Sequence, residues 1–283
     1  MRIDLHTHSN ISDGTDTPAA LVSAAAEAGL DAVALCDHDT MLGVPEAQAA
    51  GQVFGVAVLR GLEMSAELGG VTIHLLGYGC DPVAEPLAAA LSEVRQGRDE
   101  RVPRMVAALN AAGLPLTVED VLAQATPGTT LGRPHVADAM IAQGLVSDRQ
   151  EAFMLWLGEG CPGYVSHPRI PIEQGIAMIR GAGGVTVLAH AWGRGSRRVL
   201  TPRVIAQLAE FDGLDGLEVD HRDHDGPTRA ALRTLAEAND LLVTGSSDYH
   251  GTGKIDHDLG CETTTQANYE AIIALIKDRS GRL

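Results

Sequence analysis

The feature that most constrains this chain is a pair of histidines placed directly after a short apolar segment at its beginning. The run Ile3-Asp4-Leu5-His6-Thr7-His8 has the character of a buried strand that ends in two imidazoles. Residues i and i+2 of a strand point to the same face, so both rings can reach one point in space. Imidazole is the commonest protein ligand for divalent metals. The pair therefore predicts a metal site at the end of the first strand.

Further metal-ligating side chains follow other apolar segments. They recur where a predicted strand ends, at Asp37-His38-Asp39, Glu63, His74, His190 and Asp248-Tyr249-His250. Histidines that only fill a core would not collect at strand ends in this way. The distribution indicates a multinuclear metalloenzyme.

Strand and helix signals alternate in both terminal parts of the chain. Thr17-Pro18 predicts the start of a helix, with Thr as N-cap and Pro in the first turn, and Gly29 predicts its end. We expect strands at 3–5, 31–36, 56–62, 71–78, 185–189, 214–219 and 241–244, and later helices at 172–180, 202–210, 227–239 and 268–277. About seven strands with intervening helices favour a parallel α/β structure, most simply a barrel.

The middle of the chain interrupts this alternation. Helical patterns at 83–112, 118–124, 134–143 and 149–157 are separated by Gly and Pro, and no convincing strand lies among them. We interpret residues 81–165 as a helical insertion that covers the active site. Residues 1–80 and 166–283 would then form one discontinuous metal-binding barrel.

Composition narrows the class of protein. A chain of 283 residues with 45% hydrophobic content can bury a large core. Its four cysteines are scattered along the sequence without a paired motif, which is typical of the reduced thiols of a cytosolic protein. There is no run of about 18 apolar residues and no basic-then-apolar leader, so we expect a cytoplasmic protein without a membrane span. The net charge of −16 argues against a broad nucleic-acid-binding surface. It does not exclude a nucleotide substrate, because bound divalent cations make a site locally positive.

In parallel α/β barrels the loops after the strands build the active site, where ligands from different strands converge. Such positions hold nine candidate metal ligands: His6, His8, Asp13, His38, Glu63, His74, His190, Asp248 and His250. Nine ligands exceed the need of one ion and fit two to three, and the mixture of carboxylates and imidazoles suits Mn, Fe or Zn. Paired metals lower the pKa of a shared water and stabilise in-line displacement at phosphorus. The expected reaction is therefore phosphoester hydrolysis by a metal-activated hydroxide.

These motifs resemble the polymerase and histidinol phosphatase (PHP) family. The resemblance covers the whole chain and rests on segments 4–9, 12–14, 34–40, 61–63, the His74 strand, 188–190 and 246–250, all in the family's order. It implies a distorted seven-stranded (β/α) barrel of PHP type. Within the family, the chain is most similar to stand-alone members that remove phosphate from nucleoside 3′,5′-bisphosphates or trim 5′-phosphorylated oligoribonucleotides.

The resemblance also implies a grouping of the metal ligands. A first metal would be held by His6, His8, Glu63 and Asp248. A second would be held by Glu63, His74 and His190, with Glu63 bridging the two ions and essential for catalysis. A third would be held by Asp13, His38 and His250.

Other residues are expected to serve the substrate. Gly132-Arg133-Pro134-His135 is similar to a motif of the subgroup in which Arg and His hold substrate phosphate, so we expect Arg133 and His135 to bind substrate and to take part in catalysis. His221 follows a predicted strand and is expected to line the pocket and bind substrate, with a solvated loop as the alternative. Asp37 and Asp39 are expected to orient imidazoles or to cap the next helix. His167 and His257 are expected at the surface.

Two other functions compete with the nucleotide interpretation. Histidinol-phosphate phosphatase shares the metal pattern, although the Gly-Arg-Pro-His motif favours nucleotides. A non-catalytic PHP domain would be expected to lose ligands, whereas this chain keeps all nine. The expected partners are a small-molecule nucleotide or a short RNA, and the expected assembly is a monomer or a small homo-oligomer.

Overall fold

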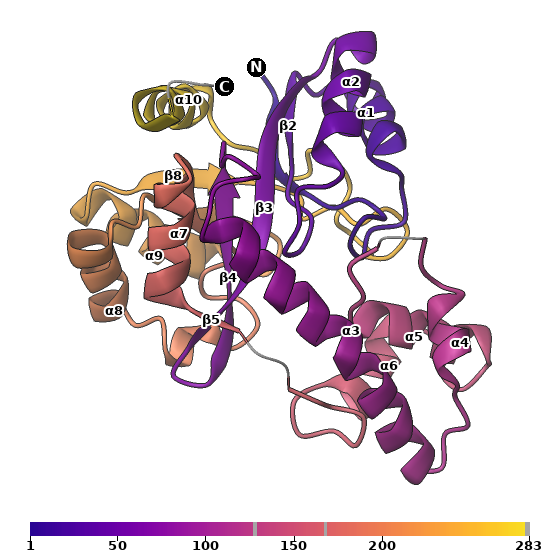
Figure 1. Cartoon of the computed structure of the whole chain (residues 1–283). Helices are drawn as coiled ribbons and strands as arrows, with labels where there is room; N and C mark the ends of the chain where they lie inside the picture. Colours follow the sequence, from indigo (N-terminus) through magenta and orange to yellow (C-terminus); the bar gives the residue numbers. More distant parts are fainter. Residues whose placement is uncertain (127–128, 167–168, 281–283) are drawn as a thin grey trace.

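The computed structural model describes residues 1–126, 129–166 and 169–280, and within them seven strands form one continuous sheet (Figure 1). In sheet order they are β1 (Ile3–Thr7), β2 (Ala32–Leu35), β3 (Ala57–Leu68), β4 (Val71–Tyr78), β6 (Val185–Leu188), β7 (Gly216–Asp220) and β8 (Leu242–Gly245). A two-residue strand, β5 (Ile170–Pro171), pairs with β3 outside this path. The predicted distorted seven-stranded barrel is confirmed.

The barrel is brought almost to closure between its first strand and the segment after its last. The backbone N–H of His8 donates to the carbonyl of Tyr249 at 2.8 Å, and that of Thr264 donates to the carbonyl of Ile3 at 2.9 Å. The buried Asp4 carboxylate accepts hydrogen bonds from the backbone N–H groups of Ser247 at 3.0 Å and Gly260 at 2.8 Å. These contacts hold residues 246–250 beside the end of β1.

The sheet is not wholly parallel, which corrects the expectation from the sequence. β4 runs antiparallel to both β3 and β6, because β3 and β4 form a hairpin. Its turn is made by Gly69 and Gly70, with φ of 56° and 79°, a left-handed conformation that glycine adopts without steric cost. The hairpin register sets Ser65 opposite His74, so Glu63, two residues from Ser65, lies on the same face as His74.

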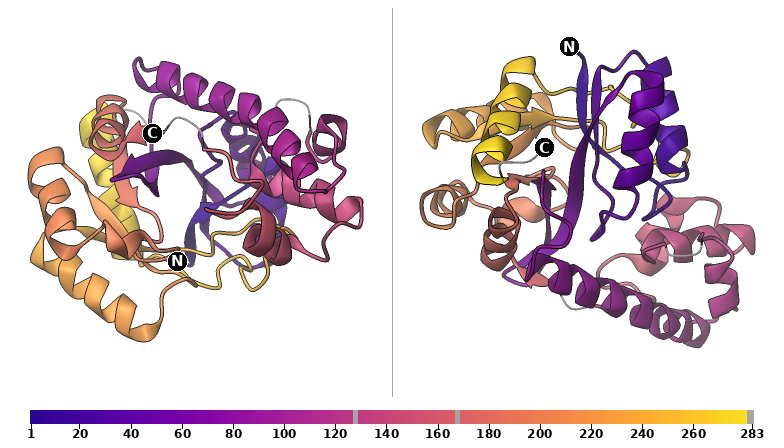
Figure 2. Two further views of the ribbon diagram at one scale, coloured as in Figure 1. Left: turned by 90° about the horizontal axis from the view of Figure 1, so that it is seen from below. Right: turned by 45° about the horizontal axis from the view of Figure 1, so that its top comes forward.

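Helices cover the outside of the strands (Figure 2). They are α1 (Pro18–Glu27), α2 (Val44–Phe54), α7 (Ile172–Gly181), α8 (Pro202–Gln207), α9 (Gly226–Ala238) and α10 (Gln266–Ser280). Thr17 caps α1 as predicted, accepting a hydrogen bond from the backbone N–H of Ala20 at 3.1 Å. Helix α2 lay outside the expected elements. None of the described helices combines the length and apolar character needed to cross a bilayer.

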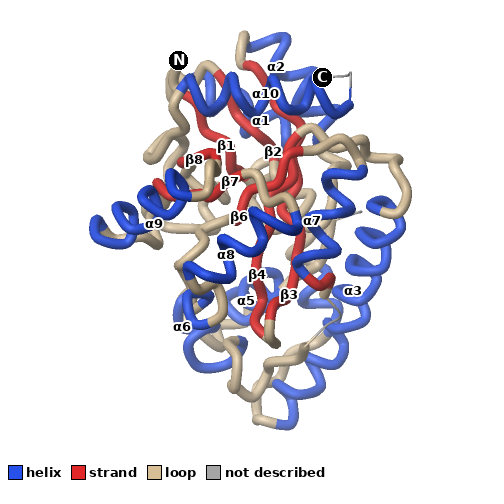
Figure 3. Tube along the Cα trace, turned by 90° about the vertical axis from the view of Figure 1, so that its left-hand side faces the viewer, coloured by secondary structure: helices blue, strands red, loops and turns tan. Residues whose placement is uncertain are grey.

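The described part of the middle segment contains helices joined by turns and loops, and no strand. It contains α3 (Leu87–Ala111), α4 (Val118–Leu122), α5 (Arg133–Ala142), α6 (Arg149–Ala152) and a π-helical turn at Phe153–Leu157. Figure 3 shows the β3–β4 pair extending past the other strands toward these helices. Helix α3 joins two cores, because Leu91 packs in the main barrel cluster while Leu109 packs in a separate cluster within the insertion. The domain boundaries at 81 and 165 stay a prediction.

Because the insertion has its own core, a cavity made there should act locally. We expect Leu109→Ala, at a fully buried site, to cost about 2–5 kcal/mol and to reduce amide-exchange protection in α3, α4 and α5. Leu21→Ala is the matched variant, since Leu21 is equally buried but belongs to the barrel cluster. Equal loss of protection across the strands and the insertion in Leu109→Ala would contradict two separable cores.

Candidate metal centre

The first two candidate ligands converge as their spacing predicts. The Nε2 atoms of His6 and His8 lie 3.0 Å apart, and both side chains are fully buried. Two carboxylates face this pair. Glu63 Oε2 lies 3.4 Å from His6 Nε2 and 3.2 Å from His8 Nε2, and Asp248 Oδ1 lies 3.7 and 3.5 Å from the same atoms. Two ring nitrogens and two carboxylate oxygens from β1, β3 and the loop after β8 therefore surround one point.

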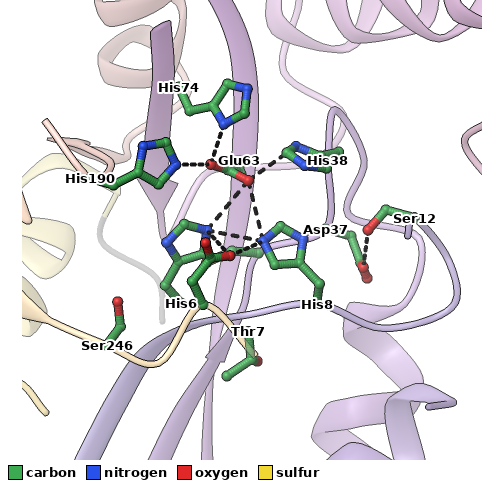
Figure 4. Close-up of polar contacts among 12 residues, drawn as sticks. His6, Thr7, His8, Ser12, Asp37, His38, Glu63, His74, His190 and Ser246 are labelled. Carbon is green, nitrogen blue, oxygen red and sulfur yellow. Dashed lines mark hydrogen bonds and ion pairs between the residues drawn. The ribbon is translucent and has the colours of Figure 1, made fainter. Parts of the chain in front are cut away.

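Glu63 occupies the middle of the cluster (Figure 4). Its Oε2 faces His6 and His8, while its Oε1 lies 2.7 Å from His74 Nδ1 and 3.2 Å from His190 Nε2. The two oxygens of one carboxylate thus face two different groups of imidazoles. A carboxylate placed in this way can be shared between two cations.

A third group lies beside the first. Asp13 Oδ1 lies 3.3 Å from His250 Nε2, and Asp13 Oδ2 lies 3.6 Å from His38 Nε2. The other nitrogen of the His38 ring, Nδ1, lies 3.1 Å from Glu63 Oε2. His38 therefore borders both this group and Glu63. All nine sequence-predicted ligands are brought to one end of the barrel.

Outer hydrogen bonds decide which nitrogen of two of these rings faces inward. His6 Nδ1 lies 3.0 Å from Glu218 Oε1, and His250 Nδ1 lies 2.8 Å from the carbonyl of Asp248. In the neutral ring, an acceptor at Nδ1 places the single proton there and leaves the lone pair on Nε2. The inward nitrogens of His6 and His250 are thus prepared to bind a cation.

The chemistry of the cluster fits divalent metal ions. Among the described residues, the buried Nδ1 atoms of His8, His38 and His74 have no hydrogen-bond partner. His74 Nδ1 lies 2.7 Å from Glu63 Oε1 but is not aligned for a hydrogen bond. Buried polar atoms are costly when they are left unsatisfied, and a cation bound among these nitrogens and oxygens would satisfy them.

Charge coupling inside the cluster shifts the ionisation of its members. Burial lowers the pKa of His8, but hydrogen bonds to Asp248 and Glu63 outweigh it and raise that pKa to about 9. Burial alone would raise the pKa of Glu63, yet the neighbouring charges of His74, His38 and His6 hold it well below its ordinary value. Burial and the charge of Arg194 lower the pKa of His190 to about 3. The Glu63 carboxylate is therefore ionised, as a metal ligand must be.

A cavity of about 1130 Å³ opens beside the cluster. Asp13, His38, His74 and His250 lie in its wall on the barrel side. Its lining also includes seven cationic residues, among apolar, aromatic and acidic side chains: Arg98, Arg101, Arg133, Arg149, Arg169, Arg194 and Lys254. Helices α3 and α5 of the insertion supply three of these, so the insertion forms part of the cavity wall.

Two cationic residues of the cavity, Arg194 and Lys254, contact Asp248, and the sequence did not predict these contacts. Arg194 donates to Asp248 Oδ2 at 2.6 Å and to Asp223 Oδ2 at 2.9 Å, and Lys254 forms a short ion pair with Asp248 Oδ2. Arg194 belongs to the basic segment 193–198, for which the sequence favours a solvated loop over a role in steering phosphate. One signal was available for Lys254, because this Arg-rich chain has only two lysines and Lys254 lies close after Asp248.

Two predicted substrate residues do not line this cavity. His221 is fully buried and approaches Asp248 Oδ2 with its Nε2 at 3.3 Å. Its Nδ1 accepts a hydrogen bond from the backbone N–H of Asp223 at 3.0 Å, so the ring proton lies on Nε2 and points to Asp248. His135 Nδ1 accepts from the backbone N–H of Gly132 at 3.0 Å and thereby holds the start of α5. Arg133, in contrast, does lie in the cavity wall.

Asp37 holds the loop after β1 and Asp39 contacts strand β3, and neither takes the predicted position against an imidazole or at a helix start. Asp37 accepts hydrogen bonds from the Ser9 backbone N–H at 2.8 Å and from the hydroxyls of Ser9 and Ser12 at 2.7 Å each. Asp39 accepts from the backbone N–H of Ser65 at 2.6 Å. Helix α2 has Gly43 as its N-cap, without a side-chain bond.

The two histidines expected at the surface have different outcomes. His257 is buried, with Nδ1 2.5 Å from the carbonyl of Ser247, so that prediction is wrong. Its sequence neighbours Asp256 and Asp258 are polar, whereas its contacts in the structure are with the segment after β8 and with the ring of His221. His167 lies outside the described residues.

Comparison with known proteins agrees with this arrangement. The sequence model of the PHP domain matches residues 4–115. The chain is 35% identical to a 3′,5′-nucleoside bisphosphate phosphatase of Chromobacterium violaceum, covering 91% of this chain and 90% of that protein. It is 31% identical to a 5′-3′ exoribonuclease of Haemophilus influenzae, covering 88% and 90%. A solved structure from Bifidobacterium adolescentis, provisionally described as a metal-dependent phosphoesterase, superposes with a TM-score of 0.91 at 40% identity and 96% coverage of both chains.

The raised pKa of His8 predicts how metal binding depends on pH. Below about 9 the metal-free site holds a proton on His8, and that proton must leave before the ring can ligate a cation. We expect the affinity for Mn²⁺ to increase as the pH rises toward that value, with proton release on binding. Calorimetric titration in buffers of different ionisation enthalpy measures both quantities. Affinity that is constant with pH, without proton release, would contradict the prediction.

Proposed function

The chain belongs to the PHP family of metal-dependent phosphoester hydrolases, and we propose that its substrates are nucleotides that carry a second phosphate, either nucleoside 3′,5′-bisphosphates or short 5′-phosphorylated RNA. The observation that carries this proposal is a wall of arginines in the same cavity as the candidate metal ligands. The end of the cavity beside the candidate metal ligands would bind the phosphate that is hydrolysed. The arginines would bind the second phosphate.

Two to three divalent ions, of Mn, Fe or Zn, would be held by the nine ligands. His6, His8, Asp248 and Glu63 would hold the first, Glu63, His74 and His190 the second, and Asp13, His38 and His250 the third. When bound, such ions activate water and polarise the phosphoryl oxygens. Glu63 would be essential because its two oxygens face two of the groups.

The arginine wall is formed by Arg98, Arg101, Arg133 and Arg169. Arg98 pairs with Asp39 at 2.8 Å and Arg169 with Glu67 at 3.3 Å. Burial lowers the pKa of Arg101 to about 9, and the charges of Arg98 and Arg133 add to that effect. Guanidinium groups crowded against one another in a chain of net charge −16 favour an anion with several acceptor oxygens.

Arg133 is the member of this wall best placed for substrate. Its guanidinium carbon lies 5.4 Å from the ring centre of Phe153 and 5.8 Å from that of Tyr164, and Nη1 donates to the carbonyl of Leu157 at 3.3 Å. Stacking against two rings fixes the plane of the guanidinium without using all five of its donors. The remaining donors would bind phosphate. In place of direct substrate contact, His135 would hold the helix that carries Arg133, and His221 would orient Asp248.

Arg194 and Lys254 would act at the reacting phosphate. Both line the cavity and already contact Asp248, so their charges lie beside the proposed first metal group. Fixed cations at this position stabilise negative charge that develops on the phosphoryl oxygens during displacement. This role supplements the arginine wall, which would bind the phosphate that does not react.

Histidinol phosphate fits the cavity less well. It carries one phosphate and a cationic amine, so the arginine wall would have no second anion to bind and would repel the amine. A nucleotide with two phosphates gives both ends of the cavity a matching charge. The electrostatics of the cavity therefore favour the nucleotide substrate.

Product analysis with three substrates tests the proposed function. We expect purified protein with added Mn²⁺ to convert adenosine 3′,5′-bisphosphate to AMP, or to release mononucleotides from a 5′-phosphorylated oligoribonucleotide, and to leave histidinol phosphate largely intact. Either nucleotide result would support the proposal and choose between its two forms. Turnover of histidinol phosphate alone would reject it.

Replacing Arg133 tests the arginine wall separately. We expect Arg133→Ala to lower kcat/KM for the bisphosphate about tenfold or more, since a hydrogen bond to a charged group contributes about 1.5–3 kcal/mol. Hydrolysis of p-nitrophenyl phosphate, which lacks a second phosphate, should change little. Arg203→Ala, at an exposed position of α8, is the matched control. Equal losses on both substrates would contradict binding of the second phosphate by Arg133.

A further inference from the structure

Glu218 is a buried carboxylate that the nine ligands do not include. We propose that it is a positioning residue, which fixes the ring of His6 and the backbone of His190 so that both present a nitrogen to the same metal centre. The inference rests on the proposed metal centre and does not depend on which phosphoester the protein hydrolyses.

Three donors from three neighbouring parts of the barrel meet on this one side chain. Glu218 lies on β7 and is fully buried. Its Oε1 faces His6 Nδ1 at 3.0 Å and accepts a short hydrogen bond from the Ser246 hydroxyl. Its Oε2 accepts a hydrogen bond from the backbone N–H of His190 at 2.6 Å. The carboxylate thus links β1, the end of β6 and the segment after β8.

The contact with His6 sets the tautomer of that ring. An ionised carboxylate at Nδ1 can only accept, so when the ring loses one proton to ligate a metal, the proton that remains is on Nδ1 and the lone pair is on Nε2. That Nε2 lies 3.0 Å from His8 Nε2 and 3.4 Å from Glu63 Oε2. The opposite tautomer would direct an N–H group into the proposed first metal group and remove a ligand from it.

The contact with His190 stabilises an unusual backbone conformation. His190 has a φ of 30°, in the left-handed region that residues other than glycine rarely adopt. Such a conformation costs of order 1–3 kcal/mol unless its surroundings hold it in place. The hydrogen bond from the His190 N–H to Glu218 provides this support. The ring of His190 then approaches Glu63 Oε1 with its Nε2 at 3.2 Å.

Packing alone gives no reason for a carboxylate at this position. The strand neighbours Leu217 and Val219 are apolar and fully buried in the main barrel cluster, whereas Glu218 points to the other face of the strand. A buried charge usually stabilises a fold less than an apolar residue of similar volume. The loss of stability caused by burying Glu218 has a reason if this side chain positions ligands of the metal centre.

Glu218→Gln keeps the shape of the side chain but replaces one acceptor oxygen by a donor. The amide can no longer accept from both His6 and His190, so one ligand loses its orientation. We expect the affinity of the metal-free protein for Mn²⁺, measured by calorimetric titration without substrate, to fall about 10- to 100-fold. Because no substrate is used, failure of nucleotide turnover would leave this test intact.

Asp215→Asn is the matched control. Asp215 directly precedes β7 and is also a largely buried carboxylate, but it pairs with Arg279 at 2.6 Å and Arg180 at 2.9 Å, outside the metal centre. We expect this variant to lower the thermal unfolding temperature and to bind Mn²⁺ like the wild type. Unchanged Mn²⁺ affinity in Glu218→Gln, or an equal loss in Asp215→Asn, would overturn the proposal.

A spectroscopic measurement on the wild type decides the question if Glu218→Gln does not fold. Zn²⁺ is diamagnetic, so the ring nitrogens of His6 can be observed by NMR in the zinc-loaded protein. We expect the proton on Nδ1 and the metal on Nε2. Ligation of His6 through Nδ1 would overturn the proposal.

Discussion

Near-closure of the barrel between its first strand and the segment after its last strand is the constraint on which the site depends. The pairs His8–Tyr249 and Ile3–Thr264, with the buried Asp4 carboxylate, bring the two terminal parts of the chain together. Without these bonds, the first two histidines and the pair Asp248 and His250 would not share one site. These hydrogen bonds between the two terminal parts of the chain therefore determine whether the candidate ligands can meet.

The second constraint is the cost of burying many ionisable groups together. Isolated buried charges are strongly unfavourable, so each carboxylate must have cations or donors around it. Glu63 is surrounded by imidazoles, and Asp248 is contacted by Arg194, Lys254 and His221. A cluster balanced in this way can persist before metal binds. It also keeps the inward nitrogens of His6 and His250 directed at the positions where cations would be held.

The insertion is joined to the metal centre by more than apolar packing. Arg98, on helix α3, pairs with Asp39 at 2.8 Å and donates to the hydroxyl of Ser65 at 2.6 Å. Ser65 lies two residues from Glu63 on β3. An arginine of the proposed phosphate wall therefore contacts the strand that carries the central carboxylate.

The sequence by itself determined the set of candidate metal ligands and most of the strands that carry them. A strand imposes a two-residue periodicity, and helices have recognisable ends, so the His6-Thr7-His8 pair, the cap at Thr17 and the strand at 71–78 could be predicted locally. Tertiary structure decided the direction of β4, the burial of His257 and the place of His221 behind Asp248. It also revealed Glu218, Arg194 and Lys254 as neighbours of the ligands. These features depend on contacts between segments far apart in the chain. A local sequence pattern does not predict which distant acceptor will form a hydrogen bond with a histidine ring nitrogen.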